Sequence, residues 1–304
     1  MNVLITGGAG FIGSHLADRL IARGDNVSVI DNLLTGRREN LPKDVKFYNK
    51  GVEEWCGYIF DSEKPDIVIH AAASYNDPDN WERDIMTNGV GTANIVRESL
   101  DYNVKRLIYF QTSLCYGIPK EQPIRITHPI NPFSSYAISK TTGESYIANS
   151  ELDYVSFRLA NCYGERNLTG PIPTFYKRLT SGQKCFVVKS RRDFVYISDL
   201  VDIVMKAIDG EGNKGKYHIS TGSDFSIKEL FDNVCEALNI KVDAEIKERS
   251  KDDVATILLD PSKTLRDFNI KALSVPLKEG ILRAVKWYQE NTVGETYTHL
   301  RGLK

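Results

Sequence analysis

The chain opens on a short apolar run, a glycine-rich segment and a helical stretch, and this order constrains its fold more than any other feature. Gly7, Gly10 and Gly13 stand three residues apart in TGGAGFIG, between apolar residues 3–5 and a helix expected over 11–23. Gly7 and Gly10 lack a Cβ, so the backbone can turn tightly and approach a pyrophosphate, and Gly13 lets the helix lie close to the sheet. The helix N-terminus adds free N–H groups and a partial positive charge. The segment therefore predicts a dinucleotide-binding turn.

The next expected strand ends in VIDN, and its aspartate indicates which dinucleotide is bound. Asp31 stands at the end of that strand, where a carboxylate accepts hydrogen bonds from ribose hydroxyls and repels a 2′-phosphate. This favours NAD over NADP. Arg37 and Arg38 follow in a loop and leave NADP open as the less favoured cofactor. The alternative is an α/β protein in which the glycines only make a tight turn.

Apolar strands alternate with helices, which predicts a parallel sheet covered on both faces. After residues 3–5, strands are expected at 26–30, 45–48, 66–70, 106–111 and 154–159, and helices at 81–102 and 135–149. Later helices are expected at 200–208, 227–238 and 278–290, with short strands near 184–188, 217–220 and 242–246. The expected fold class is α/β: a doubly wound parallel Rossmann sheet in an NAD-binding domain of residues 1–161. A smaller mixed α/β C-terminal lobe of residues 162–304 follows, with the site in the cleft between the two.

Composition and charge exclude several other classes of protein. The 304 residues are 41% hydrophobic and 26% charged, with a formal net charge of -1, so neither nucleic acid nor a membrane surface is an expected partner. The five cysteines are scattered, which argues against disulfides and against a zinc site, and no metal is expected. We find no secretion signal and no apolar stretch of the ~20 residues that span a bilayer. A cytoplasmic protein is expected.

The segment SSYAISK places a phenol and an ammonium four residues apart on an expected helix. Tyr136 and Lys140 therefore share one helical face. A phenol with a pKa near ~10 is a poor base at neutral pH, but a nearby ammonium and an oxidised nicotinamide would lower that pKa. Tyr136 could then remove a proton from a carbinol while hydride leaves for the cofactor. An isolated pair of this kind is usually a solvated helix face; the upstream glycine turn favours the functional interpretation.

Several motifs, in order and at similar separations, resemble the extended short-chain dehydrogenases in their nucleotide-sugar epimerase and dehydratase branch. They are TGGAGFIGSHL, DNLLTGRREN, VIHAAA, NGVGTANIV, QTSLCYG, SSYAISK, RLANCYG, RDFVYISDL and LDPSKTLRDF. The resemblance runs nearly end to end. TFYKRLTSGQKCF and TSLCYG are most similar to the epimerase-like enzymes of bacterial lipopolysaccharide O-antigen synthesis.

The resemblance implies roles for individual residues. It makes Tyr136 the catalytic base, Lys140 its partner, and Thr112 the hydroxyl that orients the reacting sugar oxygen. The substrate contacts that it implies, beside Thr112, are Asn161, Arg192 and, by a weaker match, Arg249. The residues expected at NAD are Gly7, Gly10, Phe11, Ile12, Gly13, Asp31, Asn32, Ala71, Ala72, Ala73, Tyr136 and Lys140. His70 is expected to serve packing rather than catalysis, and the contact to adenine near Glu53 is left open.

The two positions after Thr112 depart from the pattern of the dehydratases. Members that eliminate water have an Asp-Glu pair there, whereas this chain has Ser113 and Leu114. Leucine can neither protonate a departing hydroxyl nor move a proton from the neighbouring carbon. The expectation is therefore epimerisation of a nucleotide sugar through a transient 4-keto intermediate. A dehydratase that uses Cys115 or another acid, a reductase that releases its product, and a cofactor-sensing protein without turnover remain alternatives.

The same resemblance implies a substrate and a partner. The nucleotide is expected to be UDP by the habit of the family, and the sugar is not identified. Family members usually dimerise through two helices per subunit, which here correspond to residues 81–102 and 135–149. A homodimer is therefore expected by analogy.

Overall fold

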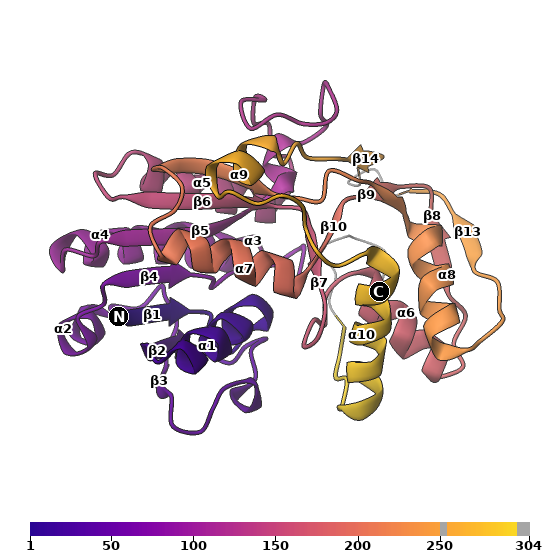
Figure 1. Cartoon of the computed structure of the whole chain (residues 1–304), viewed down its shortest axis with the longest axis horizontal. Coiled ribbons are helices and arrows are strands. Elements are labelled where there is room, and N and C mark those ends of the chain that lie inside the picture. The colour runs from indigo at the N-terminus through magenta and orange to yellow at the C-terminus, as the bar shows by residue number, and fades with distance from the viewer. Residues whose placement is uncertain (250–253, 297–304) are drawn as a thin grey trace.

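The fold is built on one seven-stranded parallel sheet, seen in a computed structural model that describes residues 1–249 and 254–296 (Figure 1). The strand order is β11-β6-β5-β4-β1-β2-β3. The strands are β1 (Asn2–Thr6), β2 (Asn26–Asp31), β3 (Lys46–Asn49), β4 (Ile67–His70), β5 (Arg106–Thr112), β6 (Tyr154–Leu159) and β11 (Gly215–Ile219). Every neighbouring pair in this sheet is parallel. The predicted doubly wound α/β fold is confirmed.

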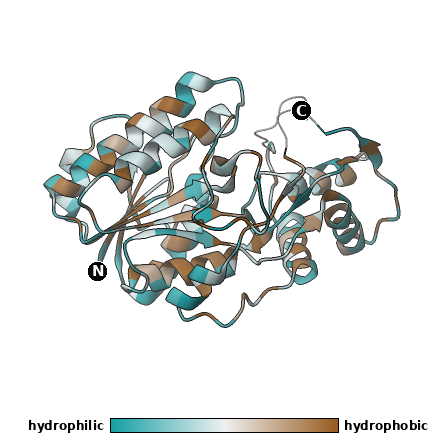
Figure 2. Ribbon diagram, turned by 90° about the horizontal axis from the view of Figure 1, so that it is seen from above, coloured by the Kyte–Doolittle hydropathy of each residue, from teal (hydrophilic) through white to brown (hydrophobic). Residues whose placement is uncertain are grey.

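Alternation along the strands divides the core into two layers, because successive side chains in a strand point to opposite faces. In β1, Val3 and Ile5 pack with α1 (Phe11–Arg23) and α7 (Ile197–Ile208). Leu4 faces the other way and packs with α2 (Gly57–Glu63), α4 (Thr92–Asp101) and α5 (Ser135–Ala148). Figure 2 shows the sheet between these two helical layers. The sheet is thus covered on both faces, as its continuous apolar strands predict.

The helix expected over 81–102 is interrupted by a π-helical segment. It consists of α3 (Trp81–Asp84), the π-helical η2 (Ile85–Gly91) and α4. Inside it, the Asn88 amide nitrogen donates to the Ser74 carbonyl (2.9 Å) and to Ser139 Oγ of α5 (3.0 Å). The Thr92 hydroxyl donates to the Asn88 carbonyl (2.7 Å). These side-chain bonds hold the wider turn against α5, the helix that carries Tyr136.

The smaller lobe lies beside the carboxyl ends of the strands and is formed mostly by α6 (Pro171–Thr180), α8 (Ile227–Leu238) and α10 (Leu277–Glu290) (Figure 1). These helices pack against one another. Helix α8 begins at a capping box formed by Ser226 and Glu229, which satisfies the first N–H groups of the helix. The remaining elements are β7 (Asn161–Tyr163), β8 (Phe186–Val188), β9 (Arg191–Arg192), β10 (Phe194–Tyr196), β12 (Phe225–Ser226), β13 (Glu245–Lys247), β14 (Thr256–Ile257), α9 (Ser262–Asp267), η1 (Arg38–Asn40) and η3 (Ser113–Tyr116).

The seventh strand of the sheet comes from beyond residue 161. The strand expected near 217–220 is β11, and it pairs with β6 in register from Gly215↔Val155 to Ile219↔Leu159. Helix α7, also beyond residue 161, covers the sheet beside α1. The chain therefore returns to the sheet after it has begun the smaller lobe. Across residues 1–249 and 254–296, we find no helix with the length and apolar character needed to cross a membrane.

Candidate active site

A cavity of about 1090 Å³ lies where the carboxyl ends of the strands meet the smaller lobe. Its walls come from the glycine turn after β1, the ends of β2 and β5, the loop after β4, the first turns of α5, and residues of β7, α6, β8 and β9. Ligands in open parallel sheets bind at this edge, outside the carboxyl ends of the strands. The cavity is large enough for a dinucleotide and a second ligand together.

The glycine turn approaches the loop after β4 so closely that side chains would not fit. Gly7 has φ +68°, and a Cβ added there would lie 2.5 Å from the backbone nitrogen of Ala72. A Cβ on Gly13 would lie 2.4 Å from the carbonyl oxygen of Gly7. Gly10 is the N-cap of α1, and among the described residues no side chain caps the first N–H groups of that helix. The helix N-terminus is therefore open to an anionic group in the cavity. Gly7, Gly10, Phe11, Ile12, Gly13, Ala71, Ala72 and Ala73 all line the cavity.

Asp31 ends β2 and ties the glycine turn to the strand. Its carboxylate accepts hydrogen bonds from the backbone nitrogens of Ala9 (2.9 Å) and Leu33 (2.8 Å). Burial raises the pKa of Asp31, and these backbone donors act in the opposite direction. Asp31 and Asn32 both line the cavity, as expected for residues that contact a ribose.

Glu53 supplies a test of whether the cavity fits a dinucleotide. Its carboxylate oxygen Oε2 is enclosed and has no hydrogen-bond partner among the described residues, although Glu53 lines the cavity. A buried acceptor of this kind needs a donor. The amino group of an adenine is such a donor, and Glu53 lies beyond the end of β3, away from Tyr136 along the sheet. Together with the cradle at Gly7 and Gly13, it fits NAD.

His70, at the end of β4, is held as a neutral packing residue. Its Nε2 lies 2.9 Å from Thr92 Oγ1, and its Nδ1 lies 2.7 Å from Thr6 Oγ1. Because the Thr92 hydroxyl already donates to Asn88, Nε2 carries the proton and Nδ1 accepts from Thr6. Burial lowers the pKa of His70 to about 3. Both ring nitrogens are thus bonded within the core, and His70 is not among the residues of the cavity wall.

Helix α5 presents Tyr136 and Lys140 to the cavity. The helix begins at Ser134, whose side chain accepts from the Ala137 nitrogen, and its register brings both residues to one face. Lys140 Nζ lies 4.0 Å from the ring centre of Tyr109, and the Tyr109 hydroxyl donates to the Lys140 carbonyl (2.9 Å). Burial lowers the pKa of Lys140 to about 7. The ammonium is thus held between a cation–π contact and the cavity.

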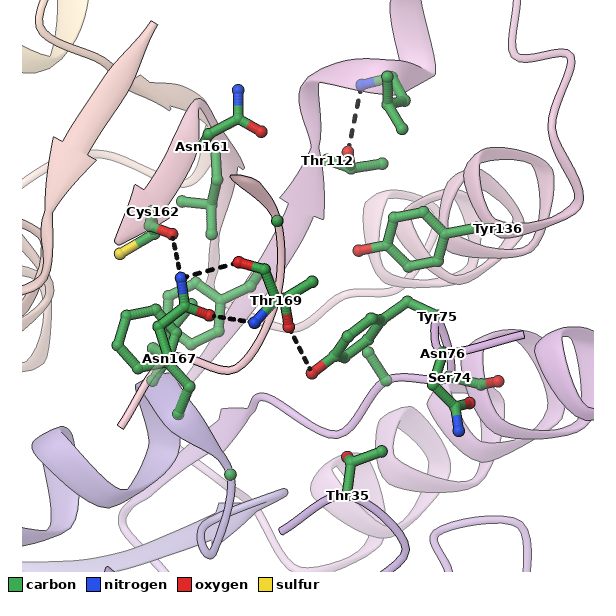
Figure 3. Close-up of a pocket in the computed structure, with 18 of the residues that line it drawn as sticks. Thr35, Ser74, Tyr75, Asn76, Thr112, Tyr136, Asn161, Cys162, Asn167 and Thr169 are labelled. Atoms are coloured by element: carbon green, nitrogen blue, oxygen red, sulfur yellow. Dashed lines mark hydrogen bonds between the residues drawn. The ribbon is translucent and has the colours of Figure 1, made fainter. Parts of the chain in front are cut away.

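The pKa of Tyr136 moves the other way in the chain alone. Burial raises it, and the neighbouring Tyr75 and Asp84 act in the same direction. The lowering expected from the sequence is therefore not reached in the chain alone, and it requires the positive charge of an oxidised nicotinamide in addition to that of Lys140. Figure 3 shows the Tyr136 hydroxyl pointing into the cavity, with Thr112 on one side of it and Tyr75 on the other.

Thr112 ends β5 beside this pair. Its hydroxyl accepts from the Leu114 nitrogen (3.2 Å), which fixes the oxygen at the start of η3. Ser113 and Leu114 also line the cavity, so the positions where a dehydratase would have acids present a hydroxyl and an aliphatic side chain. Cys115 is fully buried, and burial raises the pKa of its thiol to about 12. Both observations argue against Cys115 as a replacement acid.

The residues predicted for the substrate are only partly brought together. Asn161 and Arg192 line the cavity on β7 and β9. Asn161 Nδ2 donates to the Asp193 carbonyl (3.2 Å), and Arg192 Nη1 donates to the Ala255 carbonyl (3.2 Å). Arg249 is exposed and is not among the residues of the cavity wall. The weaker sequence match at Arg249 is thus not supported by its position.

Sequence reasoning missed several residues of the wall. Lys177 and Arg178 of α6 add two cations to it. Across the cavity the Thr169 hydroxyl lies 3.4 Å from the Tyr75 hydroxyl, to which it donates, and the ring of Tyr75 lies 6.3 Å from that of Tyr136 (Figure 3). The basic pair in TFYKRL was the available signal for the cations; nothing in the sequence brings Tyr75 and Thr169 together.

A doubly wound sheet, a glycine turn with an acidic strand end, and a Tyr–Lys helix at one cavity define a nicotinamide-dependent enzyme of the short-chain dehydrogenase type. The model of the NAD dependent epimerase/dehydratase family matches residues 3–220. This chain belongs to that family, and the predicted cofactor, NAD, is confirmed.

Several relatives are similar over nearly the whole chain. A putative UDP-glucose 4-epimerase of Methanocaldococcus jannaschii is 31% identical, over 95% of this chain and 99% of its own. The crystal structure of Bordetella bronchiseptica WbmH with NAD+ has a TM-score of 0.92 at 48% identity, over 96% of this chain and 99% of that one. WbmG of the same organism, with NAD and UDP, has a TM-score of 0.91 at 43% identity, over 99% of this chain and 97% of that one.

Proposed function

We propose that this chain is an NAD-dependent UDP-sugar 4-epimerase that acts through a transient 4-keto sugar. The observation that carries the proposal is the composition of the reacting end of the cavity. Tyr136, Lys140 and Thr112 line it, while Ser113 and Leu114 stand where an acid pair would be needed to eliminate water. The proposal is supported by the similarity to proteins named UDP-glucose 4-epimerase and to a structure that holds NAD and UDP.

Each residue has a distinct part in this mechanism. NAD, when bound, supplies the acceptor and the donor of hydride. Tyr136 takes the proton of the C4 hydroxyl and later returns it, Lys140 stabilises the phenolate by its charge, and Thr112 orients the sugar oxygen. Because the hydride returns to the opposite face, the sugar must turn over inside the cavity while its diphosphate stays bound.

The diphosphate is held at the far side of the cavity in this proposal. Arg192, Lys177 and Arg178 bring three cations to that wall, and Asn161 adds an amide. Guanidinium groups suit phosphate oxygens because their donors form a rigid fork. We therefore assign residues 1–161 mainly to the cofactor and residues 162–304 mainly to the nucleotide sugar, although β11 completes the sheet and α7 covers it.

The product and its mass test the proposal. Purified protein is incubated with UDP-glucose and with UDP-N-acetylglucosamine, and the sugars are followed by NMR and mass spectrometry. Epimerisation gives an isomer of equal mass with no net use of cofactor. Loss of water would establish a dehydratase, stoichiometric use of cofactor a reductase, and retained NAD without conversion of any UDP-sugar a sensor.

A conservative substitution assigns the base. Tyr136→Phe is expected to retain NAD and to abolish conversion, because it removes only the hydroxyl. Tyr58→Phe is the matched control, since Tyr58 lies on α2, is exposed and does not line the cavity. Equal turnover in the two variants would remove Tyr136 from the mechanism.

We also propose that the chain forms a homodimer through two neighbouring helical segments. Exposed apolar side chains gather there: Trp81, Ile85, Met86 and Val90 on α3 and η2, and Ile138 and Tyr146 on α5. The segments pack against each other, so these side chains belong to one face of the protein. A cytoplasmic location and a part in bacterial surface polysaccharide synthesis are further proposals, supported by the resemblance of TFYKRLTSGQKCF and TSLCYG to that branch of the family.

A further inference from the structure

Gln111, the residue before Thr112 on β5, carries a hydrogen-bond donor that the protein does not satisfy. The side chain is 1% exposed, and Gln111 belongs to the cavity wall. Its carbonyl Oε1 accepts from the Thr112 backbone nitrogen (2.8 Å). A backbone N–H can only donate, so this bond fixes which end of the amide is oxygen and which is nitrogen. The nitrogen Nε2 is enclosed and has no partner among the described residues.

An enclosed donor without a partner is costly to the folded protein. Buried polar side-chain atoms are nearly always paired, and leaving one unpaired costs the desolvation of that group. In the described part of the chain four side-chain atoms are in this state, on Glu53, Ser99, Gln111 and Arg166. Two of these residues, Glu53 and Gln111, belong to the cavity wall. Glu53 offers an acceptor near the end of β3, and Gln111 offers a donor at the end of β5.

The position of Gln111 on its strand brings this residue close to the reacting end. Residues two apart in a strand lie on the same side of the sheet, about 7 Å apart, so Gln111 follows Tyr109. Tyr109 touches Lys140 through both its ring and its hydroxyl. Gln111 comes one step further toward the carboxyl edge, on the face of the sheet that α5 covers. The first turns of α5 carry Tyr136. Its carbonyl is bonded to Thr112, the residue assigned to the sugar oxygen.

We propose that Gln111 is a further substrate-binding residue, whose Nε2 donates a hydrogen bond to an acceptor oxygen of the sugar at the reacting end. This proposal rests on the proposed UDP-sugar substrate. The carboxamide oxygen of the nicotinamide is the other acceptor that could reach this end of the cavity. The sugar is favoured because Gln111 is tied to Thr112, whose hydroxyl faces the reacting sugar in the mechanism. A fixed amide donor then discriminates against sugars that lack an acceptor at that place.

The test uses a variant that keeps one half of the amide and changes the other. In Gln111→Glu a carboxylate oxygen still accepts from the Thr112 nitrogen, but the NH₂ donor is lost. Gln289→Glu on α10 is the matched control, because Gln289 is exposed and does not line the cavity. Gln111→Met, which removes both halves at similar size, is made alongside in case the buried carboxylate prevents folding.

Binding is measured by calorimetry on the NAD-loaded proteins with UDP, UDP-glucose and UDP-N-acetylglucosamine. We expect the affinity gained by adding the sugar to UDP to fall about tenfold in the Gln111 variants, with affinity for UDP and NAD content unchanged. A purely structural role would weaken UDP and UDP-sugars alike. That result would overturn the proposal. So would unchanged affinity for every ligand in the Gln111 variants, or a wild type that binds UDP-sugars no more tightly than UDP.

Two further outcomes show whether the acceptor is on the sugar or on the nicotinamide, and separate this proposal from the proposed epimerase activity. If a Gln111 variant loses NAD but still gains the full affinity from adding the sugar to UDP, the assignment to the sugar is overturned and the acceptor lies on the nicotinamide. Conversion is followed independently by NMR on the wild type. A protein that binds UDP-sugars but does not interconvert them would refute the epimerase, while the selective loss of sugar affinity in Gln111→Glu would still support this residue's role.

Discussion

Replacing Gly7 by alanine separates two reasons for a glycine at the first turn. Gly7 has φ +68°, which disfavours any L-residue, and a Cβ added there would also lie against the backbone of Ala71 and Ala72. Gly182, at the end of α6, has φ +67° and nothing within 4 Å of an added Cβ. The pair Gly7→Ala and Gly182→Ala therefore shares the backbone conformation and differs in the close approach.

The expected losses of unfolding free energy follow from the backbone conformation and from the close approach. A left-handed backbone costs an L-residue about 1–2 kcal/mol, which applies to both variants. The methyl group at residue 7 would lie 2.5 Å from Ala72 N and 2.6 Å from Ala72 Cα, and backbone atoms cannot rotate away. Overpacking of this kind costs a further amount of about 1–3 kcal/mol. We expect Gly7→Ala to lose about 2–5 kcal/mol of unfolding free energy and Gly182→Ala about 1–2 kcal/mol.

Urea denaturation of the two variants and the wild type measures these losses, and the NAD retained through purification measures the effect on the site. Gly7→Ala should also lose NAD, because relief of the clash moves the turn that cradles the pyrophosphate, whereas Gly182→Ala should retain it. Equal destabilisation, with NAD retained by both, would show that the close approach carries no energetic weight.

Three other changes test the site and the surface. Burial lowers the pKa of Lys140 from 10.5 to about 7. Between these pH values the unfolded chain binds more protons than the folded protein, so the unfolding free energy of the NAD-free protein should rise with pH. This rise should vanish in Lys140→Met, as measured by denaturation at several pH values. Glu53→Gln should weaken NAD binding about five- to tenfold in a titration of NAD-free protein, since it removes an acceptor from the adenine end, while the exposed neighbour variant Glu54→Gln should bind as the wild type does. Ile85→Glu should shift the protein from dimer to monomer in sedimentation experiments, and Leu282→Glu, an exposed change on α10, should not; a wild type that sediments as a monomer would refute the dimer itself.

The parts of the site that the sequence predicts are those carried by short, contiguous motifs. Gly7, Gly13 and Asp31 lie within one strand–turn–helix–strand unit, and Tyr136 and Lys140 lie on one helix. Their spatial relation follows from local geometry, because a helix repeats every 3.6 residues and a strand every two. The fold class follows in the same way from the alternation of apolar strands with helices.

The remainder depends on contacts between distant segments. Tyr75 and Thr169 meet through a hydrogen bond across 94 positions of the chain, and no periodicity predicts such a pair. The donor of Gln111 is conspicuous only once its burial and its bond to Thr112 are known. The sequence likewise predicts ordinary helix at the π-helical segment, because that segment depends on side-chain bonds of Asn88 to Ser74, in the loop after β4, and to Ser139 of α5.

The pairing of β11 with β6 has a consequence for how the enzyme can move and how it can be divided. The polypeptide passes between the sheet and the smaller lobe more than once, so any opening of the site must bend several chain segments together. A fragment ended at residue 161 would bare the hydrogen-bonding groups of β6 along one side, inviting intermolecular strand addition. Shorter versions intended only to bind the cofactor should therefore carry the chain through residue 219.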